Sequence, residues 1–312
     1  MLLRVIHETA YDYAPPVKTA QHMAHLKPRH DARQQVLSHR LTISPMPAQQ
    51  IESTDVYGNS RAFFSLAGTL EELSVVADSV VATQAHAAPT GSIPWEAARE
   101  RMRYHRSAEW DPASEFVFAS PHVPRHEHFL AYARPCFTSG RPLWEACRDL
   151  TQRIHADFTY ETEATDISTP ALEALAMRKG VCQDFAHIML GCLRSLGLPG
   201  RYVSGYLLTQ PPPGKPRLIG SDASHAWVSV YLPGDEGEPG AWADLDPTND
   251  QAPGEDYVRL ATGRDYSDVS PIRGVIHGGA HHTLSVAVTV APVEAAEGAA
   301  YNLFPPTATE AS

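Results

Sequence analysis

The 312-residue chain lacks the features that mark several large classes of protein. It has four cysteines, none in a CxxC pair, so neither a disulfide framework nor a redox motif is indicated. No stretch approaches the roughly 18 uninterrupted apolar residues of a transmembrane helix. Lysine and arginine number 25 against 36 aspartate and glutamate, which gives a net charge of −11, and they form no basic cluster. These absences argue against binding to nucleic acid or to anionic membranes.

The first residues, MLLRVIHETAYDYAPP, have no sustained apolar region and no small-residue cleavage site, so we expect no signal peptide. Together with the few cysteines, this predicts a cytoplasmic protein from a reducing compartment. We also expect no cofactor and no metal: the histidine group HVPRHEH is interrupted by Pro124 and lacks an acidic ligand to complete a usual zinc set, and HGGAHH has the same weakness. The oligomeric state stays open, and a homo-oligomer is compatible with the sequence.

The order of the sequence patterns predicts an α+β fold. A chain longer than about 250–300 residues usually contains more than one core. Residues 1–85 contain short alternating runs divided by Pro, Gly and Asn, which predict an N-terminal antiparallel β domain. Residues 86–140 form a proline-marked connector, and residues 141–265 a core of helices followed by strands. Residues 266–293 are a C-terminal strand segment, whose strand 281–293 is expected to pair with one of the sheets, and the tail 294–312 is expected to be disordered.

Within the core, apolar residues recur at helical spacing. The run RPLWEACRDLTQRIHADF (141–158) predicts one helix, and STPALEALAMRKG predicts a second, with Thr169 as its N-cap and Gly180 just beyond its end. A third helix starts near Cys182 and stops at Gly197. Strands are predicted over residues 201–208, 225–233, 241–247 and 281–293.

Cys182 differs from the other cysteines in its position. It falls in the first turn of the third helix, where unpaired backbone N–H groups and the positive end of the helix dipole stabilise a thiolate. Cys192 lies on the apolar stripe of the same helix and is expected in the core, as are Cys136 and Cys147. Position alone makes Cys182 a candidate nucleophile, with a half-buried structural cysteine as the alternative.

Two further residues supply partners for a thiolate. Alternation along the strand HAWVSVYLP puts His225 and Trp227 on the more open face, where the indole would exclude water from the histidine. Asp246 precedes a proline, which forces it into an extended conformation at a strand end, whereas Asp244 is expected to face solvent or to be a secondary ligand of the site. A thiolate, a histidine base and an orienting carboxylate form one nucleophilic set.

Other residues could line the same site. Asp184 is expected to cap the third helix, with a substrate-facing role as the alternative. Tyr160 in DFTYE and the glycine-preceded Tyr206 could line a cleft, and core packing is the alternative for both.

The sequence resembles the transglutaminase-like superfamily in its bacterial branch, on the motifs GVCQDFAH, DASHAWVSVYLPG and WADLDPTND. The resemblance implies a papain-like core, in which a helix carrying the nucleophile packs on an antiparallel sheet, behind a β-rich N-terminal domain. It implies Cys182 as nucleophile, His225 as base and Asp246 as orienting acid. Ser229 departs from the pattern, since an acidic residue often follows the Trp by two positions in this family.

The function implied is thiol-dependent acyl transfer on amide or peptide bonds. If water accepts the acyl group, the protein is a peptidase or amidase; if an amine accepts it, the reaction is transamidation. The expected partner is therefore a peptide or small amide substrate. Two alternatives stay open: an arylamine acetyltransferase-like activity, although the RGG usual before that family's thiol is missing, and a non-catalytic peptide-binding scaffold.

Overall fold

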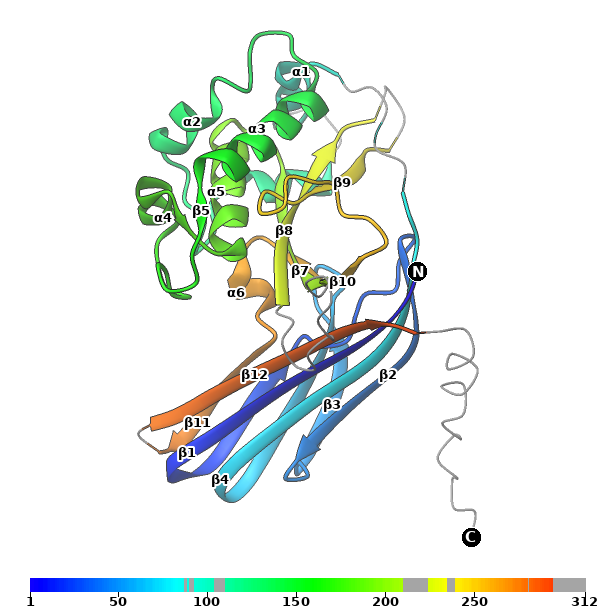
Figure 1. Cartoon of the computed structure of the whole chain (residues 1–312), viewed down its shortest axis with the longest axis vertical. Coiled ribbons are helices and arrows are strands. Elements are labelled where there is room, and N and C mark those ends of the chain that lie inside the picture. Colours follow the sequence, from blue (N-terminus) through cyan, green and yellow to red (C-terminus); the bar gives the residue numbers. More distant parts are fainter. Residues whose placement is uncertain are drawn as a thin grey trace, which may run out of the picture.

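The computed structural model describes residues 1–86, 89, 93–103, 110–209, 224–234, 239–279 and 281–293. Within these residues the chain forms two antiparallel sheets, and the helices gather around one of them (Figure 1). The α+β class predicted from the sequence is confirmed. None of the helices in these ranges is long and apolar enough to cross a membrane. The tail 294–312 predicted to be disordered lies outside the described residues.

The first sheet combines strands from both ends of the chain. Its strands are β1 (Leu2–Ala24), β2 (Gln34–Ser44), β3 (Gln49–Thr54), β4 (Ser60–Thr83), β11 (Ile272–Gly278) and β12 (His281–Pro292). The long strands β1 and β4 pair with each other; β12 and β11 share the other edge of β1, and β2 and β3 share that of β4. The strand predicted over 281–293 therefore joins the N-terminal sheet, beside a strand, β11, that the sequence patterns did not predict.

The second sheet has the order β10-β7-β8-β9. Its strands are β7 (Gly200–Leu207), β8 (Ser224–Leu232), β9 (Ala241–Leu245) and β10 (Tyr257–Gly263). The helices are α1 (Trp95–Arg101), α2 (Glu127–Ala133), α3 (Leu143–Asp157), α4 (Ala171–Met177), α5 (Cys182–Ser195) and α6 (Tyr266–Val269), with a 3₁₀ helix, η1 (Pro112–Val117). Helix α5 is central: its apolar stripe, Cys192 included, is buried against β7 and β8 on one side and against α2 and α4 on the other.

The helix boundaries follow the sequence signals to within a few residues, with one error. Thr169 was predicted to cap α4, but the N-cap is Pro170, and the Thr169 hydroxyl accepts the backbone N–H of Asp166 in the preceding turn instead. The helix ends at Arg178, whose φ of 58° is left-handed. Two short parallel strands, β5 (Thr159–Tyr160) and β6 (Lys179–Gly180), then bring the residues after α3 beside those before α5.

The two sheets contact each other directly. Apolar side chains of β1, β4 and β12 pack against β7 and β10; they include Leu3, Val81 and Val290 from the first sheet and Tyr206 and Val258 from the second. Polar side chains bridge the same boundary. The amide of Asn59 donates to the backbone carbonyl of Thr262 at 2.7 Å, and the amide of Gln34 donates to that of Arg259 at 2.7 Å. Because these backbone groups belong to β10, the first sheet helps to fix the strand beside the candidate site.

Candidate active site

The thiol of Cys182 lies at the first residue of α5. The preceding Gly180 has a φ of +152°, and a Cβ there would lie 2.4 Å from the Oδ2 of Asp184, so only glycine fits. The Asp184 carboxylate accepts the backbone N–H of Val181 at 2.8 Å and the hydroxyl of Thr165 at 2.7 Å. Asp184 is 2% exposed, so it caps the helix and does not face a substrate. Cys182 is the one partly exposed cysteine among the four, all of which the structure describes.

His225 and Asp246 are in direct contact. His225 is the second residue of β8, and its Nε2 lies 2.7 Å from the Oδ2 of Asp246, which follows the end of β9. The same carboxylate is fully buried and accepts the hydroxyl of Tyr257 at 2.6 Å, the amide of Asn249 at 2.7 Å and the backbone N–H of Thr248 at 2.8 Å. Burial raises the pKa of Asp246, but the hydrogen bonds from His225, Tyr257 and Asn249 outweigh it and lower that pKa. A carboxylate that is ionised at neutral pH is thus held against the imidazole.

His225 also contacts Cys182. Burial lowers the pKa of His225, but the hydrogen bonds with Asp246 and Cys182 and the charges of both groups outweigh it and raise the pKa to about 10. Since Nε2 faces Asp246, Nδ1 is the ring nitrogen left for the thiol. The structure therefore brings together the three residues that the sequence singled out, with the imidazole between the sulfur and the carboxylate.

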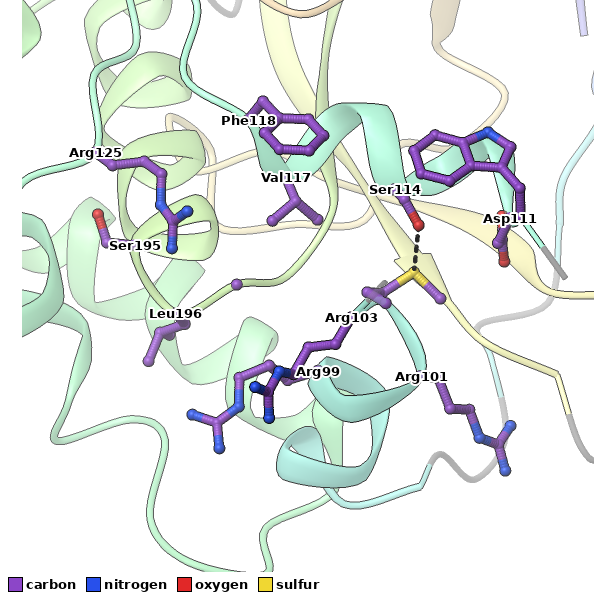
Figure 2. A pocket seen from close by; sticks show the side chains of 13 residues that line it. Arg99, Arg101, Arg103, Asp111, Ser114, Val117, Phe118, Arg125, Ser195 and Leu196 are labelled. Atoms are coloured by element: carbon purple, nitrogen blue, oxygen red, sulfur yellow. Dashed lines mark hydrogen bonds between the residues drawn. The ribbon is translucent and has the colours of Figure 1, made fainter. Parts of the chain in front are cut away.

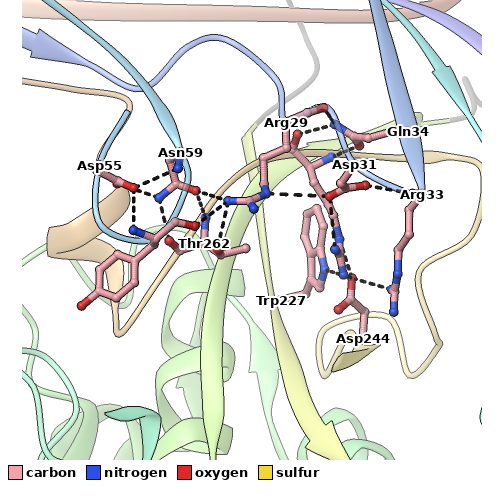
Figure 3. A network of polar contacts seen from close by, with 11 residues as sticks. Arg29, Asp31, Arg33, Gln34, Asp55, Asn59, Trp227, Asp244 and Thr262 are labelled. Carbon is pink, nitrogen blue, oxygen red and sulfur yellow. Dashed lines mark hydrogen bonds and ion pairs between the residues drawn. The ribbon is translucent and has the colours of Figure 1, made fainter. Parts of the chain in front are cut away.

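Trp227 holds the ring of His225 from one side. Its indole lies on the same face of β8 as His225, as the alternation predicts, with ring centroids 6.0 Å apart and ring planes inclined by 29°. The indole is fully buried, so the expectation that this face of β8 is the more open one was wrong at Trp227. The indole N–H donates to Asp244 at 3.1 Å. Asp244 is also buried, so the expectation that it faces solvent was wrong; it pairs with Arg259 at 2.9 Å and with Arg33 at 3.3 Å. Figure 3 shows Arg33 and Trp227 both directed at Asp244.

Comparison with known proteins identifies similarities over both parts of the chain. Residues 3–82 match the bacterial transglutaminase-like N-terminal region, and residues 131–247 match the transglutaminase-like superfamily. An uncharacterised protein of Mycobacterium tuberculosis is 42% identical over 299 residues, which are 93% of this chain and 93% of the relative. The chain belongs to the transglutaminase-like superfamily. The resemblance inferred from the three sequence motifs is thereby confirmed.

Two further similarities concern a solved structure and a named enzyme. The structure of a candidate cysteine protease from Cytophaga hutchinsonii superposes with a TM-score of 0.71 over 94% of this chain and 91% of its own; at 19% identity this shows a shared fold. A protein-glutamine gamma-glutamyltransferase of Pseudomonas aeruginosa is 31% identical over 133 residues, which are 36% of this chain and 19% of that enzyme.

The two tyrosines suggested as lining residues have different places in this transglutaminase-like protein. Tyr160, on β5, is 52% exposed and pairs with Gly180, two residues before Cys182. Burial raises the pKa of Tyr160, and the charges of Cys182 and Asp184 raise it further. Tyr206 is buried between the two sheets, where its hydroxyl is 3.0 Å from the Nδ1 of His7. The structure therefore brings Tyr160 to the site and excludes Tyr206 from it.

The sequence reasoning missed two residues that hold Asp246. Asn249 lies three positions after Asp246 in the turn DPTND, and its spacing is that of a side chain that folds back onto an aspartate in a turn. Tyr257 starts β10, a strand that was not predicted, and no local signal connects it to Asp246. Its ring also packs edge-on against Trp227, with centroids 5.3 Å apart.

Replacing Asp244 with asparagine is expected to destabilise the protein by about 3–5 kcal/mol, because Arg259 would be left buried without its main counter-charge. Urea unfolding at neutral pH measures the loss. Asp78→Asn is the matched control: its pair with Arg4 is about one-third exposed, so we expect a loss of less than about 1 kcal/mol. Equal losses in the two variants would contradict the structural role given to Asp244.

Proposed function

We propose that this protein cleaves amide or peptide bonds through a thioester on Cys182. The Sγ thiolate attacks the carbonyl carbon, the C–N bond breaks, and His225 gives its proton to the leaving amine. Neutral His225 then takes a proton from the acceptor, whose attack on the thioester breaks the C–S bond and regenerates the thiolate. One observation carries this proposal: His225 contacts both Cys182 and Asp246 and has a pKa of about 10, so it is an imidazolium at neutral pH.

The start of α5 supports the developing oxyanion. The first N–H groups of a helix have no partner within the helix, and that of Cys182 is the donor nearest to a carbonyl bound to its own sulfur. One such donor typically contributes about 2.7–4 kcal/mol to transition-state stabilisation. Asp184 supports this role because its carboxylate occupies the N–H of Val181 and leaves that of Cys182 to the substrate.

Water is the acceptor that we propose first, and an amine is the second candidate. Tyr160 beside the thiol is half-exposed, which supports access of solvent to a thioester at this site. The amine alternative rests on the similarity to a protein-glutamine gamma-glutamyltransferase over about a third of the chain. Both reactions share the same acyl-enzyme and the same three residues.

Hydrolysis and transamidation can be distinguished by the release of ammonia from a glutamine-containing peptide. The release is measured with and without an added primary alkylamine. Hydrolysis predicts ammonia in both cases and a free carboxylate product; transamidation predicts an amine-linked product and little ammonia without amine. Acylation is tested separately with p-nitrophenyl acetate, a reactive acyl donor that needs no recognition. Intact-mass spectrometry should find one acetyl group on the wild-type protein and none on Cys182→Ala, and an unmodified wild-type protein would refute the thioester.

A further inference from the structure

A cavity among the described residues lies at the opposite end of α5 from the thiol. It encloses about 530 Å³ and reaches Ser195, Leu196 and Gly197, where α5 ends. A helix of 14 residues is about 21 Å long, so the cavity is separate from the candidate active site. Its volume is in the range of pockets that take small-molecule ligands.

Four arginines line this cavity: Arg99, Arg101, Arg103 and Arg125. This is unexpected in a chain whose net charge is −11. Asp111 is the one carboxylate among the lining residues that the structure describes, and it accepts the hydroxyl of Tyr231 at 2.6 Å and the backbone N–H of Ala113 at 2.9 Å. Within the described part of the lining, four guanidinium groups therefore outnumber one carboxylate, which gives an excess of positive charge.

Helix capping accounts for two of these arginines. Arg99 and Arg101 belong to the last turn of α1, where cations interact favourably with the helix dipole; Arg99 lies over the ring of Trp95, and Arg101 donates to the carbonyl of Gly234. Arg103 follows that helix and pairs with Glu100 in a largely exposed ion pair, which contributes little and is easily exchanged. Arg125 comes from the loop before α2 and has no ion-pair partner in the described part of the chain.

Aromatic side chains face the arginines. Trp110 and Phe118, at the two ends of the η1 segment, are 58% and 59% exposed, although both line the cavity. Figure 2 shows Phe118 on one side, Arg99 and Arg101 extending from α1 on the opposite side, and Arg125 at one end. Exposed apolar groups gathered at a cavity mark binding sites more often than ordinary surface.

We propose that this cavity binds a small polyanion that carries a flat ring, which is the chemistry of a nucleotide. Guanidinium groups bind phosphate oxygens in pairs of hydrogen bonds, and both guanidinium and indole faces stack on planar rings. Arg103 and Arg125 would meet the phosphates, and Trp110 and Phe118 the ring. The proposal does not depend on the acyl-transfer chemistry at Cys182.

Isothermal titration calorimetry of the full chain with ATP tests this proposal. Inorganic triphosphate is a probe of the charge alone, and adenosine is a probe of the ring alone. We expect each fragment to bind at least about tenfold more weakly than ATP. Because a hydrogen bond to a charged group contributes about tenfold or more in affinity, the double variant Arg103→Gln, Arg125→Gln should weaken ATP about 100-fold. Phe118→Ala should weaken ATP but leave triphosphate binding unchanged.

Arg134→Gln is the matched control, since Arg134 is an exposed arginine at the end of α2 and does not line the cavity. It should bind ATP like the wild type, and all variants should unfold at the same temperature. The proposal is overturned if ATP does not bind at millimolar concentration, if the double variant binds it unchanged, or if the control loses as much affinity. If triphosphate binds as tightly as ATP, the ring contributes nothing to the affinity, and the part of the proposal that concerns Trp110 and Phe118 is wrong.

Discussion

Replacing His225 with alanine is expected to lower acyl transfer by about 10²–10⁴-fold, the range typical for the loss of a general acid–base group. The imidazolium is both the proton donor for the leaving amine and the counter-charge of the thiolate, and the variant loses both roles together. Release of p-nitrophenol from p-nitrophenyl acetate measures the second role, and turnover of a peptide amide, whose leaving group needs a proton, measures both. Amide turnover should therefore fall more than ester turnover.

Iodoacetamide at pH 6 gives a test of the same residue that needs no substrate. A cysteine with the ordinary pKa of about 8.5 is less than about 1% ionised at pH 6, so a thiol that depends on His225 should become a poor nucleophile without it. We expect the alkylation rate of Cys182 to fall about tenfold in His225→Ala, because the variant removes the imidazolium beside the sulfur. The buried Cys136, whose pKa burial raises to about 11, should stay unlabelled in both proteins.

His30→Ala is the control for both measurements, because His30 is exposed in the loop between β1 and β2. The His225 variant should remain folded: the Asp246 carboxylate keeps its hydrogen bonds from Tyr257, Asn249 and the backbone N–H of Thr248. Alkylation of Cys182 at the wild-type rate in the folded His225 variant would exclude the proposed coupling and favour a binding scaffold over an enzyme.

The candidate site could be predicted from sequence because local rules position each of its members. Helical periodicity put Cys182 at a helix start, strand alternation put His225 and Trp227 on one face, and the residue before a proline fixed Asp246 in an extended conformation. Each rule acts within a few residues. Their assembly into one site followed from the order of the elements and the family resemblance.

Features that depend on distant partners were missed. Asp244 and Asp246 have the same parity along the chain, and Asp244 is paired with the guanidinium groups of Arg33 and Arg259. Arg33 comes from the turn before β2 and Arg259 from an unpredicted strand. That strand, β10, escaped detection because a charged residue, Arg259, interrupts its apolar pattern. Tyr206 is likewise buried only because β1 and β4 pack on the end of β7. No local pattern carries this information.

Asp246→Asn is expected to change the pH dependence of catalysis as well as its rate. After burial, which lowers the pKa of His225, the hydrogen bond with Asp246 is the largest influence on that pKa, and the charge of Asp246 adds to it. Asparagine keeps the shape and removes the charge, so the pKa of His225 should fall from about 10 by about 1–3 units. The alkaline limb of kcat/KM, which reports the loss of the imidazolium in the free enzyme, should move down by the same amount.

Asp246→Asn should also change how the free energy of unfolding depends on pH, in a direction that the two pKa shifts determine. Between about pH 6.5 and 10 the folded protein holds a proton on His225 that the unfolded chain has lost, so the stability that the pair contributes falls as pH rises through this window. The lowered pKa of Asp246 acts in the opposite direction: its contribution is present above the ordinary aspartate pKa of about 3.9 and is lost as pH falls. The difference in unfolding free energy between wild type and Asp246→Asn should therefore be largest between about pH 4 and 6.5.

Asn249→Ala separates a role in orienting His225 from general damage to the loop around Asp246. It removes a different hydrogen bond to the same carboxylate at 2.7 Å but leaves the contact between His225 and Asp246 in place. We expect Asn249→Ala to lower the free energy of unfolding by about 1 kcal/mol and to leave the alkaline limb of kcat/KM near its wild-type position.

Asp246→Asn should also lower kcat by about 10²–10⁴-fold. The asparagine can turn its amide N–H toward Nε2 of His225, which favours the imidazole tautomer whose proton points at the thiol. An unchanged alkaline limb in Asp246→Asn would mean that Cys182 alone sets the charge state of His225, and Asp246 would then be a structural residue.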